Sequence, residues 1–330
     1  MASFNALVMK RLGVYCSGGD APGMNAAIRA VVRTAIVNKL EVVGFVGGYS
    51  GIHDNKHLSL DLRSVANIIQ RGGSILKAGR SPEFMQAEGR KKAADNIKAN
   101  GIDALVCIGG DGSFTGAHTL WNEHKIPVVG VPGTIDNDIL GSDDTIGFDT
   151  AVNTALDAID RIRDTAASHD RLFIVEVMGR DSGFIAIAAG VAGGAEDIFI
   201  PEHPFQLEKT IEIIKRGMAR GKTSSILVTA EGQKPGRAYD LAEAIRKHAG
   251  LQAKVCILGH IQRGGSPTAN DRILASRMGM TAVQLLLNGS CDIMVGSQGE
   301  SLVMIGFADA LKSKKQVNQP LIELAQVLSN

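Results

Sequence analysis

One stretch of the sequence constrains the fold more than any other. The apolar run Ala104–Ile108 ends in Gly109-Gly110-Asp111-Gly112-Ser113. A short apolar run closed by glycines is typical of a buried parallel strand. Residues 114–121 suit a helix, and Ser113 can cap its start. A helix N-terminus offers N–H groups to phosphate, glycine lets a ligand approach the backbone, and Asp111 suits Mg²⁺. A tight turn without a ligand remains the alternative.

The same pattern recurs along the 330 residues. A strand at 12–16 precedes a glycine turn at 17–25, and a strand at 126–131 precedes the turn 132–138. Other strands are expected at 41–46, 172–177, 197–200, 224–229 and 254–258, helices at 64–70, 150–167, 206–219, 239–248, 271–287 and 320–329, and a loose leader at 1–10. In the 150–167 helix, Val152, Leu156, Ile159 and Ile162 are expected to face inward. This alternation predicts an α/β fold with mostly parallel sheets and helices on both faces.

Chemistry-bearing residues follow three of these strands. Because right-handed crossovers place successive strand ends on one edge of a sheet, we expect Gly18, Asp111 and Asp136 at one crevice. There, one carboxylate would bind Mg²⁺ and the other would accept a proton. Asp136 and Asp138 point the same way if the chain is extended, although a local hydrogen bond in the turn is an equal alternative for Asp138.

Arginines stand at turns rather than on helical faces, at Arg80, Arg180 and Arg263. An arginine fork suits phosphate, although each arginine alone can be an ordinary surface residue. His260 follows a strand directly, so a ligand contact competes with a role as a core histidine.

Composition excludes several classes of protein. The net charge of +1, without a charged block, argues against binding to nucleic acid or a membrane surface. No apolar run is long enough to span a bilayer, and no secretory leader is visible. The four cysteines form no CxxC and suit a reducing compartment, so we expect a cytoplasmic protein. Residues 217–223 resemble a Walker A loop with one residue too few, and they precede a strand.

From the residues alone, the sequence predicts an α/β enzyme that catalyses phosphoryl transfer and binds its nucleotide without a Walker A loop. The absence of G-x-G-x-x-G argues against a dinucleotide-dependent oxidoreductase. The residues do not name the substrate.

Five longer segments extend this interpretation. They are Ser17–Asn25, Gly109–Ser113, Pro132–Asp138, Met178–Arg180 and Gly259–Pro267. Together they resemble, in order, the signatures of the 6-phosphofructokinase family, from about residue 12 to residue 280. The resemblance implies transfer of the ATP γ-phosphate to the 1-hydroxyl of fructose 6-phosphate, with Mg²⁺.

The resemblance also implies residue roles. Asp136 would be the general base, Arg180 would stabilise the transferred charge, and Asp111 and Asp138 would hold Mg²⁺. Residues implied to bind ATP are Gly18, Arg80, Gly110, Asp111, Gly112 and Ser113. Residues implied to bind the sugar phosphate are Thr134, Ile135, Asp136, Met178, Gly179, Arg180, Glu231, His260 and Arg263. Thr134 and Gly18 are counted with the catalytic residues.

Two further basic residues would reach the sugar phosphate from a neighbouring subunit, Arg171 and Lys254. This implies a homotetramer with shared active sites. Lys254 replaces an expected arginine, and the loss of the fork predicts weaker affinity for the sugar phosphate.

Donor choice and regulation follow from the same resemblance. Pyrophosphate-dependent members carry an acid at Gly112 and a lysine at Gly133, so glycine at both favours ATP. The implied ADP and phosphoenolpyruvate effector site comprises Arg29, Arg33, Arg163, Glu196, Arg220 and Lys222. Leu62 and Thr223 stand where basic residues are expected, which weakens the case for regulation.

The expected architecture is two αβα domains with the active site in the cleft between them. The resemblance implies that each domain is discontinuous, with an ATP domain of 1–147 and 259–306 and a sugar domain of 148–258 and 307–330. A second sugar substrate remains open, whereas a silent regulatory subunit would be expected to lack Asp111, Asp136 or Arg180.

Overall fold

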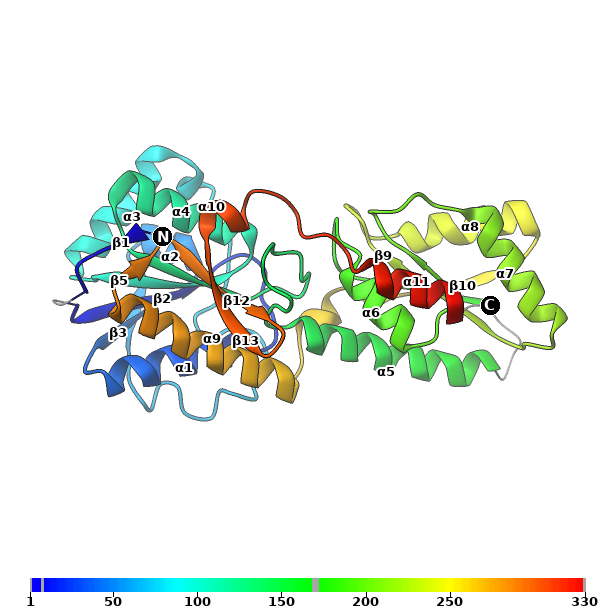
Figure 1. The fold of residues 1–330 in the computed structure, drawn as a ribbon, viewed down its shortest axis with the longest axis horizontal. Helices are drawn as coiled ribbons and strands as arrows, with labels where there is room; N and C mark the ends of the chain where they lie inside the picture. The colour runs from blue at the N-terminus through cyan, green and yellow to red at the C-terminus, as the bar shows by residue number, and fades with distance from the viewer. Residues whose placement is uncertain (1, 7–8, 168–171, 329–330) are drawn as a thin grey trace. The chain divides into compact units, whose positions relative to one another are not determined.

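The structure is a computed structural model and describes residues 2–6, 9–167 and 172–328. The chain forms two compact units (Figure 1). The first unit comprises Met1–Ile135, Ile139–Asp149 and Arg263–Lys315, and the second comprises Asp136–Asp138, Thr150–Gln262 and Gln316–Asn330. The last crossing therefore lies after Lys315, not at the expected residue 307, because Phe307 is fully buried in the first unit, where its ring lies 5.2 Å from that of Phe114.

The first unit is built on a seven-stranded sheet in the order β13-β12-β6-β5-β2-β3-β4. The strands are β2 (Arg11–Cys16), β3 (Glu41–Phe45), β4 (His57–Leu60), β5 (Ala104–Gly109), β6 (Val128–Pro132), β12 (Ile293–Gln298) and β13 (Ser301–Gly306). The five inner strands are parallel, and β4 and β13 pair antiparallel at the edges. The antiparallel edges were not predicted, but the mostly parallel α/β class is confirmed.

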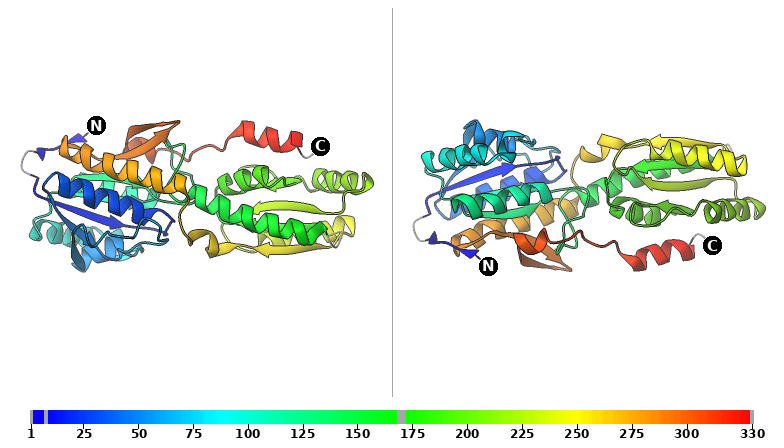
Figure 2. Two further views of the ribbon diagram at one scale, coloured as in Figure 1. Left: turned by 90° about the horizontal axis from the view of Figure 1, so that it is seen from below. Right: turned by 90° about the horizontal axis from the view of Figure 1, so that it is seen from above.

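Helices cover both faces of this sheet (Figure 2). On one face α1 (Met24–Val37) packs against α9 (Ala269–Leu287). The other face carries α2 (Gly48–His53), α3 (Ala87–Ala99), α4 (Asp111–His124), α10 (Phe307–Ala310) and the 3₁₀ helix η2 (Glu83–Met85). The apolar residues of β5 are all buried, as the uninterrupted apolar run predicts.

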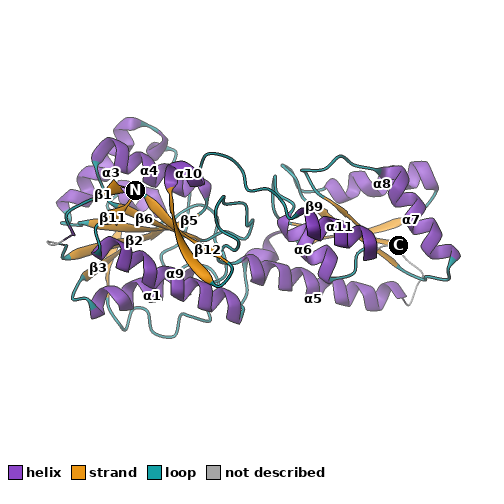
Figure 3. Cartoon of the chain, in the orientation of Figure 1, coloured by secondary structure: helices purple, strands orange, loops and turns teal. Residues whose placement is uncertain are grey.

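The second unit has a four-stranded parallel sheet in the order β10-β7-β9-β8. The strands are β7 (Leu172–Val177), β8 (Asp197–Phe199), β9 (Ser225–Ala230) and β10 (Ala253–Ile257). Its helices are α5 (Phe148–Ala167), α6 (Phe184–Ala192), α7 (Leu207–Ala219), α8 (Arg237–Ala249) and α11 (Gln319–Leu328), and the 3₁₀ helix η3 (Gly259–Arg263) follows β10. One core joins the sheet to α7 and α8. Figure 3 shows the strands of both units in orange and the helices in purple.

Several local expectations were wrong. The leader is not wholly loose, because β1 (Ala2–Ser3) pairs with β11 (Ser290–Cys291). The segment expected as a helix at 64–70 consists of turns. In α5 the inward position expected for Ile159 is confirmed, because Ile159 is fully buried. Val152, Leu156 and Ile162 are only half-buried, because the side of the helix that faces the core carries the fully buried Ala151, Ala155 and Ala166 instead.

Three parallel strands place the predicted turns at one edge of the first unit's sheet. β2, β5 and β6 are neighbours, with Cys16 opposite Ile108 and Gly109 opposite Pro132. The turns that begin at Ser17, Gly110 and Gly133 therefore leave the sheet side by side, as parallel pairing predicts. In the described part of the chain, no helix combines the length and the apolar character that crossing a membrane requires.

Candidate active site

The turn after β2 lies against two other turns of the first unit. Gly18 has a φ of 85°, and its N–H donates to the carbonyl of Gly79 at 3.4 Å. A Cβ added at Gly18 would lie 3.4 Å from Ser113 Oγ. The fold thus brings together Gly18, Ser113 and the loop that carries Arg80. This proximity is what we expect of residues that share one ligand.

The turn after β5 leads straight into α4. The helix begins at Asp111, and Gly110 occupies the N-cap position with extended backbone and no side-chain cap. Ser113 was expected to be the cap, but it lies inside the first turn, and its Oγ would be only 2.4 Å from a Cβ at Gly109. The helix start therefore has no side-chain cap, and the N-terminus of α4 carries the partial positive charge that favours an anion.

The space around Gly112 is open. Gly112 is exposed, and a Cβ placed on it would meet nothing within 4 Å. Asp111, half-buried in the first helical turn, adds a carboxylate beside this space. This start of α4 combines the partial positive charge of a helix N-terminus, access for a ligand and a carboxylate.

Arg263 lies on the first glycine turn rather than with the second unit's residues. Its guanidinium donates to the carbonyl of Asp20 at 3.0 Å, and the side chain is buried. A Cβ at Gly19 would lie 2.6 Å from Arg263 Nη1, so the glycine makes room for the guanidinium. Arg80 is exposed in the neighbouring loop.

The turn after β6 carries the residues predicted for sugar binding and proton transfer. Ile135, Asp136 and Asn137 are buried, while Thr134 and Asp138 are half-buried. Asn137 has a φ of 53°, in the left-handed region. The chain is therefore not extended here, and the argument that Asp136 and Asp138 point the same way does not apply.

In the second unit, the turn after β7 contacts Asp136 through Ser182. The Ser182 hydroxyl lies 3.1 Å from the carbonyl oxygen of Asp136 and 2.9 Å from that of Gly179. Arg180 is exposed with a φ of 51°, and its N–H donates to Glu231 Oε1 at 3.3 Å. A non-glycine residue in this conformation is strained, which is common at functional sites.

Two residues of this region were not singled out from the sequence. Gln262 is fully buried, accepts from the Met178 N–H at 2.8 Å and donates to the carbonyl of Ala151 at 3.2 Å. Ser182 is the other. Ser182 and Gln262 are uncharged polar residues, which rarely stand out in a sequence. The only signal that could have identified them is their position close to Met178–Arg180 and His260 in the chain.

Two of the remaining predicted residues lie at the surface of the second unit. His260 and Lys254 are exposed, and Lys254 belongs to the edge strand β10. Arg171 lies outside the described residues.

The residues proposed for effectors are divided between the units. Arg29 and Arg33 lie on α1 of the first unit, and Arg33 is exposed. In the second unit, Arg163 donates to the carbonyls of Gly193 and Gly194, while buried Glu196 accepts from Lys222 and from the Ile226 N–H. Arg220 and Lys222 are exposed.

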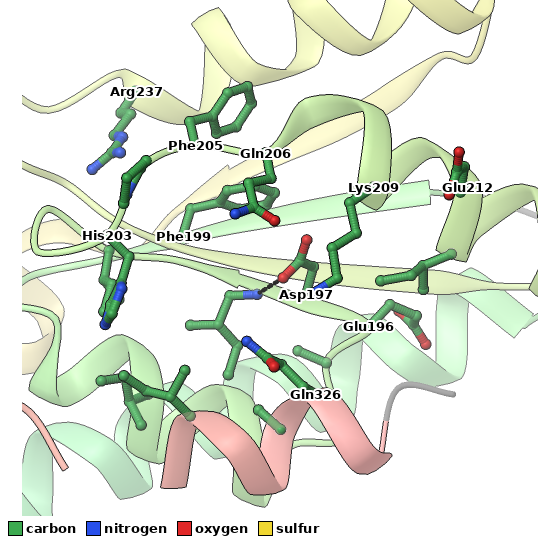
Figure 4. A pocket seen from close by; sticks show the side chains of 18 of the residues that line it. Glu196, Asp197, Phe199, His203, Phe205, Gln206, Lys209, Glu212, Arg237 and Gln326 are labelled. Atoms are coloured by element: carbon green, nitrogen blue, oxygen red, sulfur yellow. Dashed lines mark hydrogen bonds between the residues drawn. The ribbon is translucent and has the colours of Figure 1, made fainter. Parts of the chain in front are cut away.

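A pocket of about 680 Å³ lies within the second unit, lined by residues of β8, α7 and α11 (Figure 4). Of the residues predicted from the sequence, Glu196 lines it. Asp197 on the pocket wall accepts from Thr210 Oγ1 at 2.5 Å and from the Ile198 N–H at 2.9 Å. Burial raises the pKa of the Asp197 carboxyl above its ordinary value, although these hydrogen bonds oppose the shift.

Comparison with known proteins places the chain among close relatives. The family model described as Phosphofructokinase matches residues 11–286. The chain is 57% identical over 321 residues to ATP-dependent 6-phosphofructokinase 1 of Thermus thermophilus, covering 97% of this chain and 100% of the relative. It is 53% identical to the ATP-dependent 6-phosphofructokinase of Bacillus licheniformis, again over 97% of this chain and 100% of the relative.

Solved structures agree with the fold. Phosphofructokinase of Saccharomyces cerevisiae superposes with a TM-score of 0.85 at 37% identity, covering 92% of this chain and 45% of that chain. A pyrophosphate-dependent phosphofructokinase of Marinobacter aquaeolei has a TM-score of 0.82 at 22% identity, over 97% of this chain and 91% of that chain. At that identity the second likeness shows the fold alone.

Proposed function

This chain belongs to the phosphofructokinase family, and from that premise we propose that it transfers the γ-phosphate of ATP to the 1-hydroxyl of fructose 6-phosphate. The products are fructose 1,6-bisphosphate and ADP. The observation that carries the proposal is the start of α4, where Asp111 and the open space at Gly112 adjoin backbone N–H groups. Positioning and charge neutralisation are the main contributions that a protein makes to phosphoryl transfer.

In this proposal the first unit binds the nucleotide phosphates. Gly18, Arg80 and Gly110–Ser113 all belong to that unit, and Gly18 lies close to the other two turns. The N-terminus of α4 takes the role that a Walker loop has elsewhere, because it presents N–H donors and a partial positive charge. Gly112 leaves the room that a nucleotide requires and that an acidic side chain would fill.

The residues present also suit Mg²⁺. Among the described residues, no group of three or more His, Cys, Asp or Glu side chains forms a metal cage. Mg²⁺ is usually held by one or two carboxylates together with substrate phosphates, so a small donor set fits. Asp111 and Asp138, both half-buried, are the proposed ligands. When bound, the ion neutralises phosphate charge.

Asp136 is the proposed general base, which removes the proton of the sugar's 1-hydroxyl as the phosphoryl group arrives. Arg180 is exposed and its backbone is fixed by Glu231, so its guanidinium is available to the charge that develops on the phosphate. Met178, Gly179, Glu231 and His260 belong to the same unit as Asp136, whereas Thr134, Ile135 and Arg263 belong to the first unit.

The direct test is production of fructose 1,6-bisphosphate from fructose 6-phosphate and Mg²⁺, with ATP and pyrophosphate as parallel donors. We expect activity with ATP alone. Activity with pyrophosphate would overturn the account of Gly112 and Gly133. No product with either donor would contradict the proposed substrate.

Asp136→Ser tests the general base. We expect turnover to fall by about 10²- to 10⁴-fold, with ATP binding and thermal stability nearly unchanged. Asp157→Ser is the control, because Asp157 is an exposed carboxylate on α5 that pairs with Arg161. Near-normal turnover of Asp136→Ser would exclude Asp136 as the base.

We extend the proposal to a cytoplasmic homotetramer. The four cysteines are free thiols, as suits a reducing compartment. Analytical ultracentrifugation tests the assembly by measuring the mass of the particle in solution.

Regulation is tested by adding ADP and phosphoenolpyruvate to a fructose 6-phosphate saturation series. An unchanged saturation curve would exclude the effector roles of Arg163, Glu196 and Lys222.

A further inference from the structure

The first three residues of α2 contact three separate turns of the first unit. We call Gly48, Tyr49 and Ser50 the α2 corner. None of them was singled out from the sequence, and their contacts are made to the same turns that carry Gly18, Arg80 and Ser113.

Gly48 lies against the end of β2 and the loop before Arg80. Its φ is 64°, and a Cβ placed on it would be 2.7 Å from the carbonyl oxygen of Cys16 and 3.3 Å from that of Gly79. Any side chain at this position would push the two turns apart, so the glycine permits their close approach.

Tyr49 connects the corner to the first turn of α4. Its hydroxyl donates to the carbonyl of Ser113 at 2.6 Å and accepts from the hydroxyl of Tyr15 at 2.9 Å. The Tyr49 ring is buried and stacks on Phe84 with ring centroids 4.0 Å apart. A Cβ on Gly116 would lie 2.7 Å from the Tyr49 hydroxyl, so a glycine in α4 makes room for this contact.

The charge state of this pair is fixed. Burial raises the pKa values of Tyr15 and Tyr49 well above their ordinary value, so both remain protonated donors at neutral pH. The direction of the chain of hydrogen bonds is therefore set: Tyr15 donates to Tyr49, and Tyr49 donates to Ser113.

Ser50 completes the corner. Its hydroxyl donates to the carbonyl of Arg80 at 3.2 Å. Tyr49 and Ser50 thus hydrogen-bond to the backbone at Ser113 and Arg80, and Gly48 lies close to the end of β2. The three contacted segments are distant from one another in the sequence.

We propose that Tyr49 and Ser50, with Gly48 between the turns, are positioning residues that hold the three ATP-phosphate turns at a fixed spacing. The inference rests on the proposed function, since it assigns these turns to ATP. Donors aimed at a polyphosphate stabilise it only when they are held in place beforehand, and polar contacts behind the binding groups provide that order.

The test compares two substitutions within one buried cluster. Tyr49→Phe keeps the ring that stacks on Phe84 and removes the donor to Ser113. Tyr15→Phe removes a hydroxyl from the same cluster, but this hydroxyl does not donate to α4. We expect Tyr49→Phe to raise the KM for ATP about fivefold, the scale of one hydrogen bond, with the KM for fructose 6-phosphate within about twofold. Tyr15→Phe should leave both KM values within about twofold.

Ser50 supplies an independent measurement at a half-buried site, where folding is less at risk. Ser50→Ala should raise the KM for ATP, and Ser50→Thr, which retains the hydroxyl, should restore it. Titration of each variant with Mg-ATP by calorimetry should show the same order of affinities without turnover.

Three results would overturn the inference: equal KM changes in the two tyrosine variants, parallel changes for both substrates, or an unchanged KM for ATP in Tyr49→Phe and Ser50→Ala. Failure of the proposed function looks different. In that case the wild-type chain makes no fructose 1,6-bisphosphate, while calorimetry still ranks ATP affinity across the variants.

Discussion

At the scale of single residues, two glycines of the candidate ATP site have opposite surroundings. A Cβ at Gly112 meets nothing within 4 Å, whereas a Cβ at Gly133 would lie 3.0 Å from Ile108 Cγ2 and 3.2 Å from Met24 Cε. From the sequence alone, glycine at both positions was interpreted in the same way, as favouring ATP over pyrophosphate as the phosphoryl donor. The structure separates them, because one borders open space and the other is packed.

This difference predicts separable effects. Gly112→Asp should leave the free energy of unfolding nearly unchanged and raise the KM for ATP more than about tenfold, since its carboxylate would repel phosphate. Gly133→Ala should cost about 1–3 kcal/mol of stability through crowding. Urea denaturation and ATP saturation kinetics measure the two effects. A destabilised Gly112→Asp would contradict the open space at this position.

Asp197 predicts a pH dependence. Because burial raises its pKa in the folded state, the folded chain binds more protons than the unfolded chain at pH values just above the ordinary pKa of 3.8. Its contribution to stability is therefore largest below that value and is lost as the pH rises through the folded-state pKa. Asp197→Asn should be more stable than the wild type at pH 7, with the difference shrinking towards pH 4.

Urea denaturation at several pH values tests this, and Asp61→Asn is a control of opposite sign. Hydrogen bonds from Ser64 lower the pKa of exposed Asp61, so its removal should weaken the fold at neutral pH. A constant difference between Asp197→Asn and the wild type across pH would contradict the role of burial.

At the scale of elements, the sequence predicts most of the longer strands and helices, but it misses the helix α3 and the strands β12 and β13. β5 and α7 begin and end within a residue or two of the expectation, because apolar periodicity is local. The start of α4 was missed, because Gly110 rather than Ser113 holds the cap position. The two-residue strands β1 and β11 were missed because so short a pair is defined only by its partner in the folded chain. The strands β12 and β13 were not predicted either, and their antiparallel pairing is a contact of the folded chain.

The close pairing of α1 with α9 depends on Gly279. A Cβ there would lie 2.7 Å from the carbonyl oxygen of Ala27, and backbone cannot yield as a side chain can. Gly279→Ala should therefore lower stability by about 1 kcal/mol or more, despite the higher helix propensity of alanine.

Gly217 in α7 is the matched control. Its Cβ would meet the side chain of Lys222 at an ordinary 3.5 Å, so Gly217→Ala should raise stability by about 0.5–1 kcal/mol. Denaturant midpoints at constant m-value compare the two variants. The same sign for both would show that helix propensity, not helix packing, dominates at Gly279.

At the scale of the whole molecule, the chain forms two units whose sequences interleave. The residues proposed for ATP all fall in the first unit, and most of those proposed for the sugar phosphate fall in the second. Lys254 belongs to the second unit and is exposed on an edge strand, as suits a residue proposed to serve a neighbouring subunit.

Lys254→Arg tests this role. An arginine fork binds phosphate with two parallel hydrogen bonds where lysine offers a point charge, so the KM for fructose 6-phosphate should fall about two- to tenfold at unchanged kcat. Lys247→Arg, an exposed lysine on α8, is the control. An unchanged KM for fructose 6-phosphate in Lys254→Arg would remove Lys254 from the sugar site.

The sequence by itself determined the α/β class, the positions of most strands and the segments that carry the chemistry, because apolar periodicity and glycine turns are local properties of the chain. Only the tertiary structure decided that Arg263 lies on the Gly19 turn, that Asn137 turns the chain between two acids, and that Tyr49 donates to Ser113. These contacts join residues far apart in the chain or depend on backbone angles. The packing of the folded chain determines these contacts and backbone angles, so no local sequence pattern predicts them.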